Sequence, residues 1–201
     1  MTRTRALPAA LAAALTLAAA GGAALAVQDG QRHRGEDGKE TAAVLGARVS
    51  PADAIAAAER AASGRAVKLS MEKEDGTRLY EVRVATAPDR TVTVKVDPAT
   101  GAVRSTERDG VVARLLNRED RDEVQALLKA PTTLGQAVAA AERAAGGGRA
   151  VEAEWEGEGQ ALAYEVKVAK DGAGGTTKVF VDPSSGQARL AHAAAAGAAA
   201  R

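Results

Sequence analysis

The chain of 201 residues carries 27 Lys and Arg against 26 Asp and Glu, and the net charge of +1 gives no electrostatic footprint for nucleic acid. It contains no Cys, which excludes disulfides, thiolate chemistry and Cys-ligated metals. Aromatic residues make up only 2%, so any core is small and is built from Val, Leu, Ile and Ala.

The first 26 residues have the pattern of a secretory signal peptide. Arg3 and Arg5 form a positive start, an uncharged run rich in Ala and Leu follows over 7–27, and an A-x-A cleavage site lies at 24–26. The uncharged run is also about as long as the ~20 residues that a membrane span needs, so an uncleaved N-terminal anchor is the alternative. The weak hydrophobicity of Ala favours cleavage, and we expect an extracytoplasmic protein that is secreted or associated with the cell envelope.

A helix is predicted to begin at Ser50, after a disordered linker over 27–47 whose first part is polar and lacks an apolar period. Ser50 can accept a hydrogen bond from the backbone N–H of Asp53, and proline suits the first helical position. Apolar residues recur at helical spacing from Ile55 onward. We expect the helix to stop at Gly64, which adopts the left-handed conformation without steric cost.

Strands are expected next, at 67–71, 80–84, 92–96 and, more briefly, 102–105. Asp75 and Gly76 form a dipeptide that suits a tight hairpin turn. Apolar and polar residues alternate along the three longer strands, so each has one apolar and one polar face. This pattern indicates an antiparallel sheet that the helix covers on one side.

The sequence Asp97-Pro98-Ala99-Thr100-Gly101 is predicted to form a structural turn. An Asp before Pro accepts hydrogen bonds from the backbone just beyond it, and Gly closes the turn. We prefer this interpretation to that of a metal ligand, and we expect no metal and no cofactor.

The whole pattern occurs twice. Glu59 recurs as Glu142 and Tyr80 as Tyr164, and the turn recurs with Asp182, Pro183 and Gly186 in place of Asp97, Pro98 and Gly101. The second helix begins with the capping-box sequence Thr133-Leu134-Gly135-Gln136. Amphipathic helical spacing between the repeats predicts a helical connector over 107–130. The sequence therefore predicts an α+β fold of two tandem small domains, 48–106 and 131–190, each a helix packed on one face of a three- or four-stranded antiparallel sheet, with an Ala-rich tail at 191–201.

No catalytic site is expected from these residues. The polar strand faces carry Glu81 and Arg83 in the first repeat and Glu165 and Lys167 in the second, and ion pairing with solvated neighbours is their ordinary outcome. Phe180 is different, because it interrupts the polar face of its strand. Either it contacts a partner or another part of the chain covers it. These five residues are the candidate partner-binding residues.

The order of an Ala-rich helix with Glu-Arg, then Tyr-Glu-Val, then Val-Asp-Pro-x-x-Gly resembles the PepSY domain, over Val49 to Thr106 and again over Thr132 to Leu190. The resemblance implies a helix packed on an antiparallel sheet and a role in binding and restraining peptidases outside the cytoplasm. It therefore predicts an exported, non-catalytic module whose partner is a protein such as a secreted peptidase. The alternative is a structural or docking protein of the cell envelope without inhibitory activity, and an enzyme ranks third.

Overall fold

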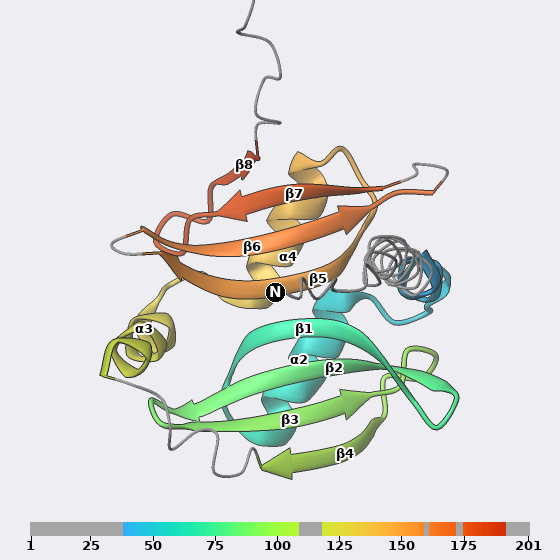
Figure 1. The fold of residues 1–201 in the computed structure, drawn as a ribbon, viewed down its shortest axis with the longest axis horizontal. Coiled ribbons are helices and arrows are strands. Elements are labelled where there is room, and N and C mark those ends of the chain that lie inside the picture. Colours follow the sequence, from blue (N-terminus) through green and yellow to red (C-terminus); the bar gives the residue numbers. More distant parts are fainter. Residues whose placement is uncertain (1–37, 109–117, 159–160, 172–174, 192–201) are drawn as a thin grey trace, which may run out of the picture. The chain divides into compact units, whose positions relative to one another are not determined.

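A computed structural model describes residues 38–108, 118–158, 161–171 and 175–191 (Figure 1). From Lys39 onward the chain forms one compact unit. Its helices and strands are, in chain order, a short helix that includes residues 39–46, α2 Pro51–Ala62, β1 Arg65–Glu74, β2 Thr77–Ala87, β3 Arg90–Val96, β4 Val103–Arg108, α3 Arg118–Lys129, α4 Leu134–Ala144, β5 Arg149–Glu158, β6 Ala161–Ala169, β7 Thr176–Val181 and β8 Ala188–Leu190. Among the described residues, no helix is long and apolar enough to cross a membrane.

The predicted α+β fold with two repeats is confirmed, but the strands of both repeats form a single sheet rather than two. The sheet has eight antiparallel strands in the order β4-β3-β2-β1-β5-β6-β7-β8 (Figure 1). Strands β1 and β5 join the repeats, with Lys68 opposite Glu154 and Leu69 opposite Ala153. Each strand would otherwise be the edge of a small four-stranded sheet with unpaired backbone groups, and their pairing removes both edges.

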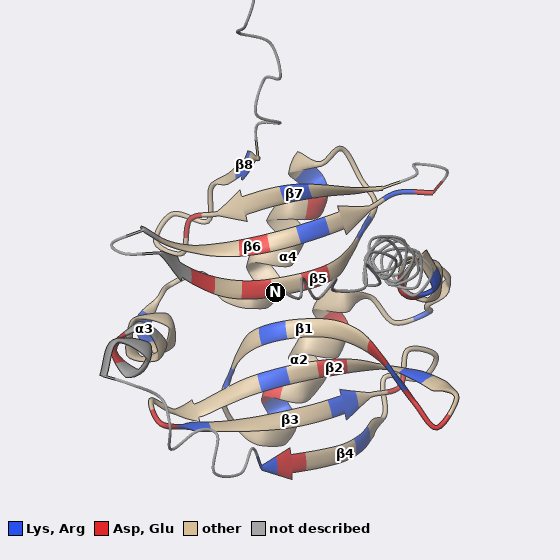
Figure 2. Ribbon diagram, in the orientation of Figure 1, with Lys and Arg blue, Asp and Glu red and all other residues tan. Residues whose placement is uncertain are grey.

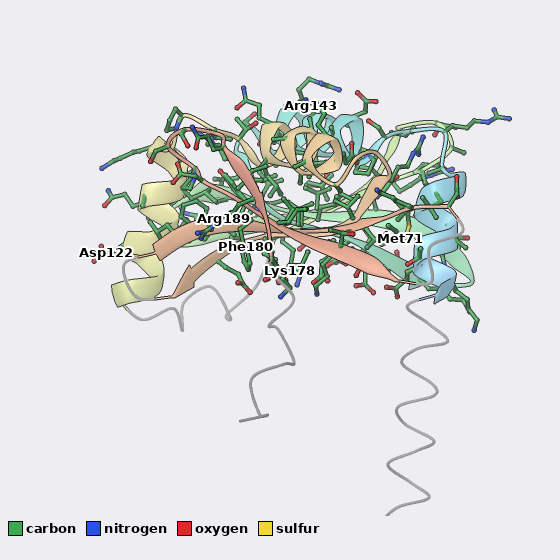
Figure 3. The ribbon with its side chains drawn as sticks, turned by 90° about the horizontal axis from the view of Figure 1, so that it is seen from above. Met71, Asp122, Arg143, Lys178, Phe180 and Arg189 are labelled. Carbon is green, nitrogen blue, oxygen red and sulfur yellow. The ribbon has the colours of Figure 1, made fainter. Side chains whose placement is uncertain are left out.

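Helices α2 and α4 cover the same face of this sheet (Figure 3). Helix α2 packs on β1, β2 and β3, helix α4 packs on β5, β6 and β7, and the two helices contact each other. Apolar residues from both repeats, including Leu69, Val82, Val138 and Val166, therefore form one continuous core. Within the described residues, neither α2 nor α4 packs on the opposite face.

Both helix starts have the predicted caps. The Ser50 side chain accepts a hydrogen bond of 3.1 Å from the Asp53 backbone. Thr133 and Gln136 form the reciprocal capping box, in which each side chain bonds the other residue's backbone N–H. These local bonds satisfy N–H groups that have no partner inside the helix.

The end of α2 differs from the prediction. The left-handed residue is Ser63, with φ 52°, rather than Gly64. Gly64 is needed for space instead, because a Cβ at that position would lie 2.4 Å from the carbonyl oxygen of Ala85 on β2. The glycine therefore lets the end of α2 approach the sheet closely.

The expectation of a disordered linker up to residue 47 is wrong for its last part, because residues 39–46 are helical. Val44 in this helix is fully buried, and so is Leu127 at the corresponding position of α3. A further helix thus precedes each of α2 and α4, and each of these preceding helices contributes one apolar side chain to the common core. Sequence periodicity did not reveal the first one, since its apolar stretch is too short to separate from a loop.

A β-bulge shifts the predicted alternation at the start of β1 and β5. The pairing register changes between Ala66 and Lys68, so Ala66 rather than Val67 is fully buried beside Leu69. The carboxylate of Glu59 on α2 accepts a hydrogen bond of 2.9 Å from the Ala66 backbone at this point. Glu142 and Ala150 repeat the same bond, also at 2.9 Å, in the second half. The repeated Glu therefore holds the bulge.

Candidate binding surface

The helix-free face of the sheet, which we call the open face, carries side chains of both charges. Basic segments lie on β1, β2, β3, β6 and β7, whereas β5 carries several acidic segments with no basic one between them (Figure 2). All five candidate partner-binding residues lie on this face, because Glu81 and Arg83 on β2 pair across to Ser70 and Lys68, and Glu165 and Lys167 on β6 pair across to Glu154 and Glu152. Phe180 on β7 lies directly opposite Glu165. Strands β1 and β5 separate the two candidates of the first repeat from the three of the second.

Ion pairs connect the two repeats on the open face. Lys68 of β1 lies 3.0 Å from Glu154 and 3.8 Å from Glu152, both on β5. Glu152 also accepts a hydrogen bond of 2.6 Å from Lys167, whose pKa it raises. This network continues the β1–β5 backbone pairing through side chains, so the middle of the open face is well compensated in charge.

Glu165 lies in an ion pair on the polar face, but its own carboxylate is covered rather than solvated. Its side chain is only 5% exposed, and its carboxylate lies 2.7 Å from Lys178 on β7. Sequence alternation placed Glu165 on the right face but could not show that its neighbours cover it.

Three carboxylates meet beside this buried group. Oxygen atoms of Glu154, Glu156 and Glu165 all lie within 4.8 Å of one another. Partial burial and the nearby carboxylates of Glu165 and Glu154 raise the pKa of Glu156. Like charges held this close disfavour ionisation of all three at once. The cluster is therefore a local concentration of negative charge that a cation would relieve.

Phe180 lies at the other side of Glu165. Its ring is half-buried, with the ammonium of Lys178 5.9 Å and the guanidinium of Arg189 5.8 Å from the ring centre (Figure 3). Neither cation covers the residue completely, so part of an aromatic surface remains accessible on the open face. That Phe180 contacts a partner stays a prediction, and within the described residues the cations beside its ring are Lys178 and Arg189.

The Asp-Pro-x-x-Gly segments form tight turns after β3 and β7. In the first, the Asp97 carboxylate accepts hydrogen bonds from the backbone of Ala99 at 2.8 Å and Thr100 at 3.0 Å, and Gly101 has a φ of 73°. The guanidinium of Arg104 lies on its second oxygen and, with these N–H groups, lowers the pKa of Asp97 to about 2.

The second turn has the same geometry, with Asp182 accepting from the backbone of Ser184 and Ser185 and Gly186 at a φ of 69°. Pro98 and Pro183 have a further role in common. The carbonyl of Pro98 accepts from the backbone of Val49, and that of Pro183 accepts from the backbone of Thr132. The first turn therefore also anchors the segment that enters α2, and the second anchors the segment that enters α4.

The buried tyrosines of the Tyr-Glu-Val motifs bind the segments that precede α2 and α4. The hydroxyl of Tyr80 donates to the carbonyl of Val49 at 3.0 Å, and that of Tyr164 donates to the carbonyl of Thr132 at 2.7 Å. Burial raises the pKa of Tyr80 to about 12 and raises that of Tyr164 as well. These hydroxyls are therefore neutral hydrogen-bond donors in the core.

Two arginines that sequence reasoning missed connect the repeats beneath the helices. Arg65 at the start of β1 donates to the carbonyls of Ala130 and Thr132, in the segment before α4. Arg149 at the start of β5 donates to the carbonyls of Val44 and Ala47, in the segment before α2. The only signal was their recurrence at equivalent positions, since arginines at strand starts are otherwise ordinary surface residues.

Among the described residues, these geometries do not bring together a nucleophile, a base and a group that orients the base. Both histidines of the chain, His33 and His192, lie outside the described residues. The groups with shifted pKa values lie in ion pairs, in the two turns, at the buried tyrosine hydroxyls and, for Glu156, beside other carboxylates. What the open face offers is a broad surface with charged groups and one accessible aromatic ring, which suits contact with another polypeptide.

Comparisons with known proteins agree with the repeated architecture. The family model for the PepSY domain, described as the peptidase propeptide and YPEB domain, matches residues 48–107 and 133–190. Among solved structures, a proposed lipoprotein from Clostridium difficile 630 aligns with a TM-score of 0.42 and 20% identity, over 76% of this chain and 98% of that chain. No curated protein matches the chain. Because the family model covers more than half of the sequence in two separate stretches, the chain belongs to the PepSY family and carries two copies of its domain.

Proposed function

We propose that the chain is an exported, non-catalytic PepSY-type binding protein that restrains or regulates an extracytoplasmic peptidase through protein–protein contact. The observation that carries this proposal is the open face of the eight-stranded sheet, which both domains share and which no described helix covers. A single sheet doubles the continuous surface that one small domain could present. Family membership supports the link to peptidases, and the signal-peptide pattern of residues 1–26 supports export.

The surface fits binding rather than catalysis. Its charged groups pair with one another across strands, and its one accessible aromatic ring offers apolar contact area. Interfaces between proteins combine such aromatic anchors with polar surroundings. A catalytic carboxylate would instead be expected in a concave site with a substrate-facing opening.

The test uses protein purified from the culture medium of a secreting host and a panel of secreted peptidases, assayed with small chromogenic substrates. Saturable inhibition that depends on dose supports the proposal, provided that mass spectrometry shows the protein uncut after the assay. This control separates an inhibitor from a competing substrate. Binding without inhibition would contradict the restraining role and favour the envelope-docking alternative.

A second arm addresses catalysis directly. Glu81→Gln and Glu165→Gln each remove one candidate acid or base from the open face. If the purified protein turns over any substrate and either variant abolishes that turnover, the non-catalytic assignment is wrong.

A further inference from the structure

The two domains serve as controls for each other on the open face. Positions that support the fold are the same in both: Glu59 and Glu142 at the bulge, Tyr80 and Tyr164 in the core, Asp97 and Asp182 in the turns. The residues that lie opposite one another across the open face are not the same. The first domain has the row Ser70, Glu81, Lys95, Ser105, and the second has Glu154, Glu165, Phe180, Arg189.

These replacements leave the second row with less favourable cross-strand pairs than the first. Glu81 has a lysine directly opposite on one side and a serine on the other. Glu165 has a phenylalanine and another glutamate in the same places. Like charges directly opposite on neighbouring strands destabilise a sheet, so this row is not optimised for stability. Departures of this kind are expected where a surface has a function.

The negative charge is also incompletely balanced. Lys68 lies beside Glu154 and Lys178 beside Glu165, but among the described residues no cation lies within ion-pair distance of Glu156. Desolvation, and then the neighbouring carboxylates of Glu165 and Glu154, raise the pKa of Glu156, and the more distant charge of Lys178 opposes the shift without cancelling it. In the first domain the corresponding residue, Glu72, has the neutral Ser70 as its neighbour along the strand.

We propose that Glu154, Glu156 and Glu165 receive a Lys or Arg side chain of a partner polypeptide, and that Phe180 holds an apolar side chain next to it. The inference rests on the proposed function, because the partner is the protein that this chain restrains. It deepens that function by assigning recognition to the open face of the second domain and by giving the partner's chemistry. A cation among three carboxylates supplies charge complementarity, and an adjacent aromatic ring supplies the apolar anchor that charged contacts alone lack.

A side-chain cation fits this surface better than a metal ion. Calcium takes six to eight oxygen ligands that surround it, whereas strands β5 and β6 present carboxylates from one side only. An extended Lys or Arg side chain needs ligands on one side and can lay its methylene groups on neighbouring apolar surface.

The experiment titrates the purified protein with two peptides by calorimetry. Both are acetylated and amidated and read Ala-Leu-Ala, a central residue, then Ala-Phe-Ala; the central residue is arginine in one and its neutral isostere citrulline in the other. The arginine peptide is expected to bind about fivefold more tightly, which is the upper range for a partly exposed ion pair. The difference should shrink as sodium chloride is raised.

Glu156→Gln should abolish the preference for arginine, and Glu72→Gln, the same change in the first domain, should leave it intact. Phe180→Lys introduces the residue type that the first domain has at the equivalent position, Lys95, and should weaken binding of both peptides. Unchanged melting temperatures establish that these substitutions leave the fold intact. Equal affinity for the two peptides, or a preference that survives Glu156→Gln, would overturn the inference. So would calcium that displaces the arginine peptide.

Peptidase inhibition is measured in parallel with the same variants. If Glu156→Gln and Phe180→Lys inhibit as well as the unchanged protein, the inference fails while the proposed function stands. If the arginine peptide binds as expected but no peptidase is inhibited, the proposed function fails and the binding surface remains.

Discussion

Arg65 of the first domain and Ala130, in the segment that leads into the second, are joined by a hydrogen bond of 2.6 Å from the guanidinium to the carbonyl oxygen. The same guanidinium donates to the carbonyl of Thr132 at 2.9 Å, which also accepts from Tyr164. Arg149 makes the equivalent bond of 2.6 Å to Ala47 in the opposite direction. The first domain therefore supplies the donor that fixes the segment before α4, and the second supplies the donor that fixes the segment before α2.

Arg65→Met should lower the free energy of unfolding by about 1.5–3 kcal/mol, because the carbonyl of Ala130 loses a charged donor in a partly buried site. Urea unfolding followed by circular dichroism measures the loss. Arg60→Met is the matched control, since Arg60 is exposed on α2 and should change stability little. Arg65→Lys should not restore stability, because one ammonium lacks the planar fork that reaches two carbonyls. Equal stability of the Arg65 and Arg60 variants would contradict the role of this bond.

Tyr80→Phe should cost about 1 kcal/mol at neutral pH through the lost bond to Val49. It should also change the alkaline limit of stability. The pKa of Tyr80 is about 12 in the fold, above its value of about 10 in the unfolded chain, so its contribution is complete below pH 10 and is lost as pH rises toward 12. Between pH 9 and about 12, the melting temperature of the variant should therefore fall less steeply with rising pH than that of the unchanged protein. Parallel curves for both proteins would contradict this assignment.

Ser63→Gly and Gly64→Ala should change stability in opposite directions although they are neighbours. Ser63 has a φ of 52°, where a side chain is strained, so glycine should stabilise by about 0.5–1 kcal/mol. A Cβ at Gly64 would lie 2.4 Å from the Ala85 carbonyl, so alanine should destabilise by about 1–3 kcal/mol. Thermal unfolding of the two variants decides the matter. If Gly64→Ala were neutral, the close approach of α2 to β2 would not be needed.

Asp97→Asn should make the stability of the fold depend less on pH in the acid range. The pKa of Asp97 is about 2 in the fold, below its ordinary value, chiefly through the Arg104 hydrogen bonds and then the backbone of Ala99. A lowered pKa stabilises the fold above the unfolded value, and this contribution is lost as pH falls from about 4 toward 2. The melting temperature of the variant should therefore vary less over that window than that of the unchanged protein. Asp89→Asn, at an exposed hairpin tip, should leave the slope as it was.

The sequence by itself determined the features that depend on residues close together in the chain. Helix caps such as Ser50 with Asp53, the Asp75-Gly76 hairpin and the period-two strands follow from interactions over a few residues. Repetition of these local patterns was sufficient to identify two PepSY domains with a helix on one face of an antiparallel sheet. Local rules failed where a residue is constrained by a distant segment. Gly64 is required because a side chain there would collide with the Ala85 carbonyl, and not because of its own backbone angle.

Only the tertiary structure decided how the two domains combine and where the open face is unusual. The pairing of β1 with β5, the exchange of Arg65 and Arg149, and the burial of Glu165 beside Lys178 all join residues far apart in the sequence. Alternation tells which face of a strand a residue occupies, but not which strand lies next to it. The physical reason is that neighbours across a sheet are chosen by the burial of backbone and apolar groups of the whole chain, and local patterns contain no record of that choice.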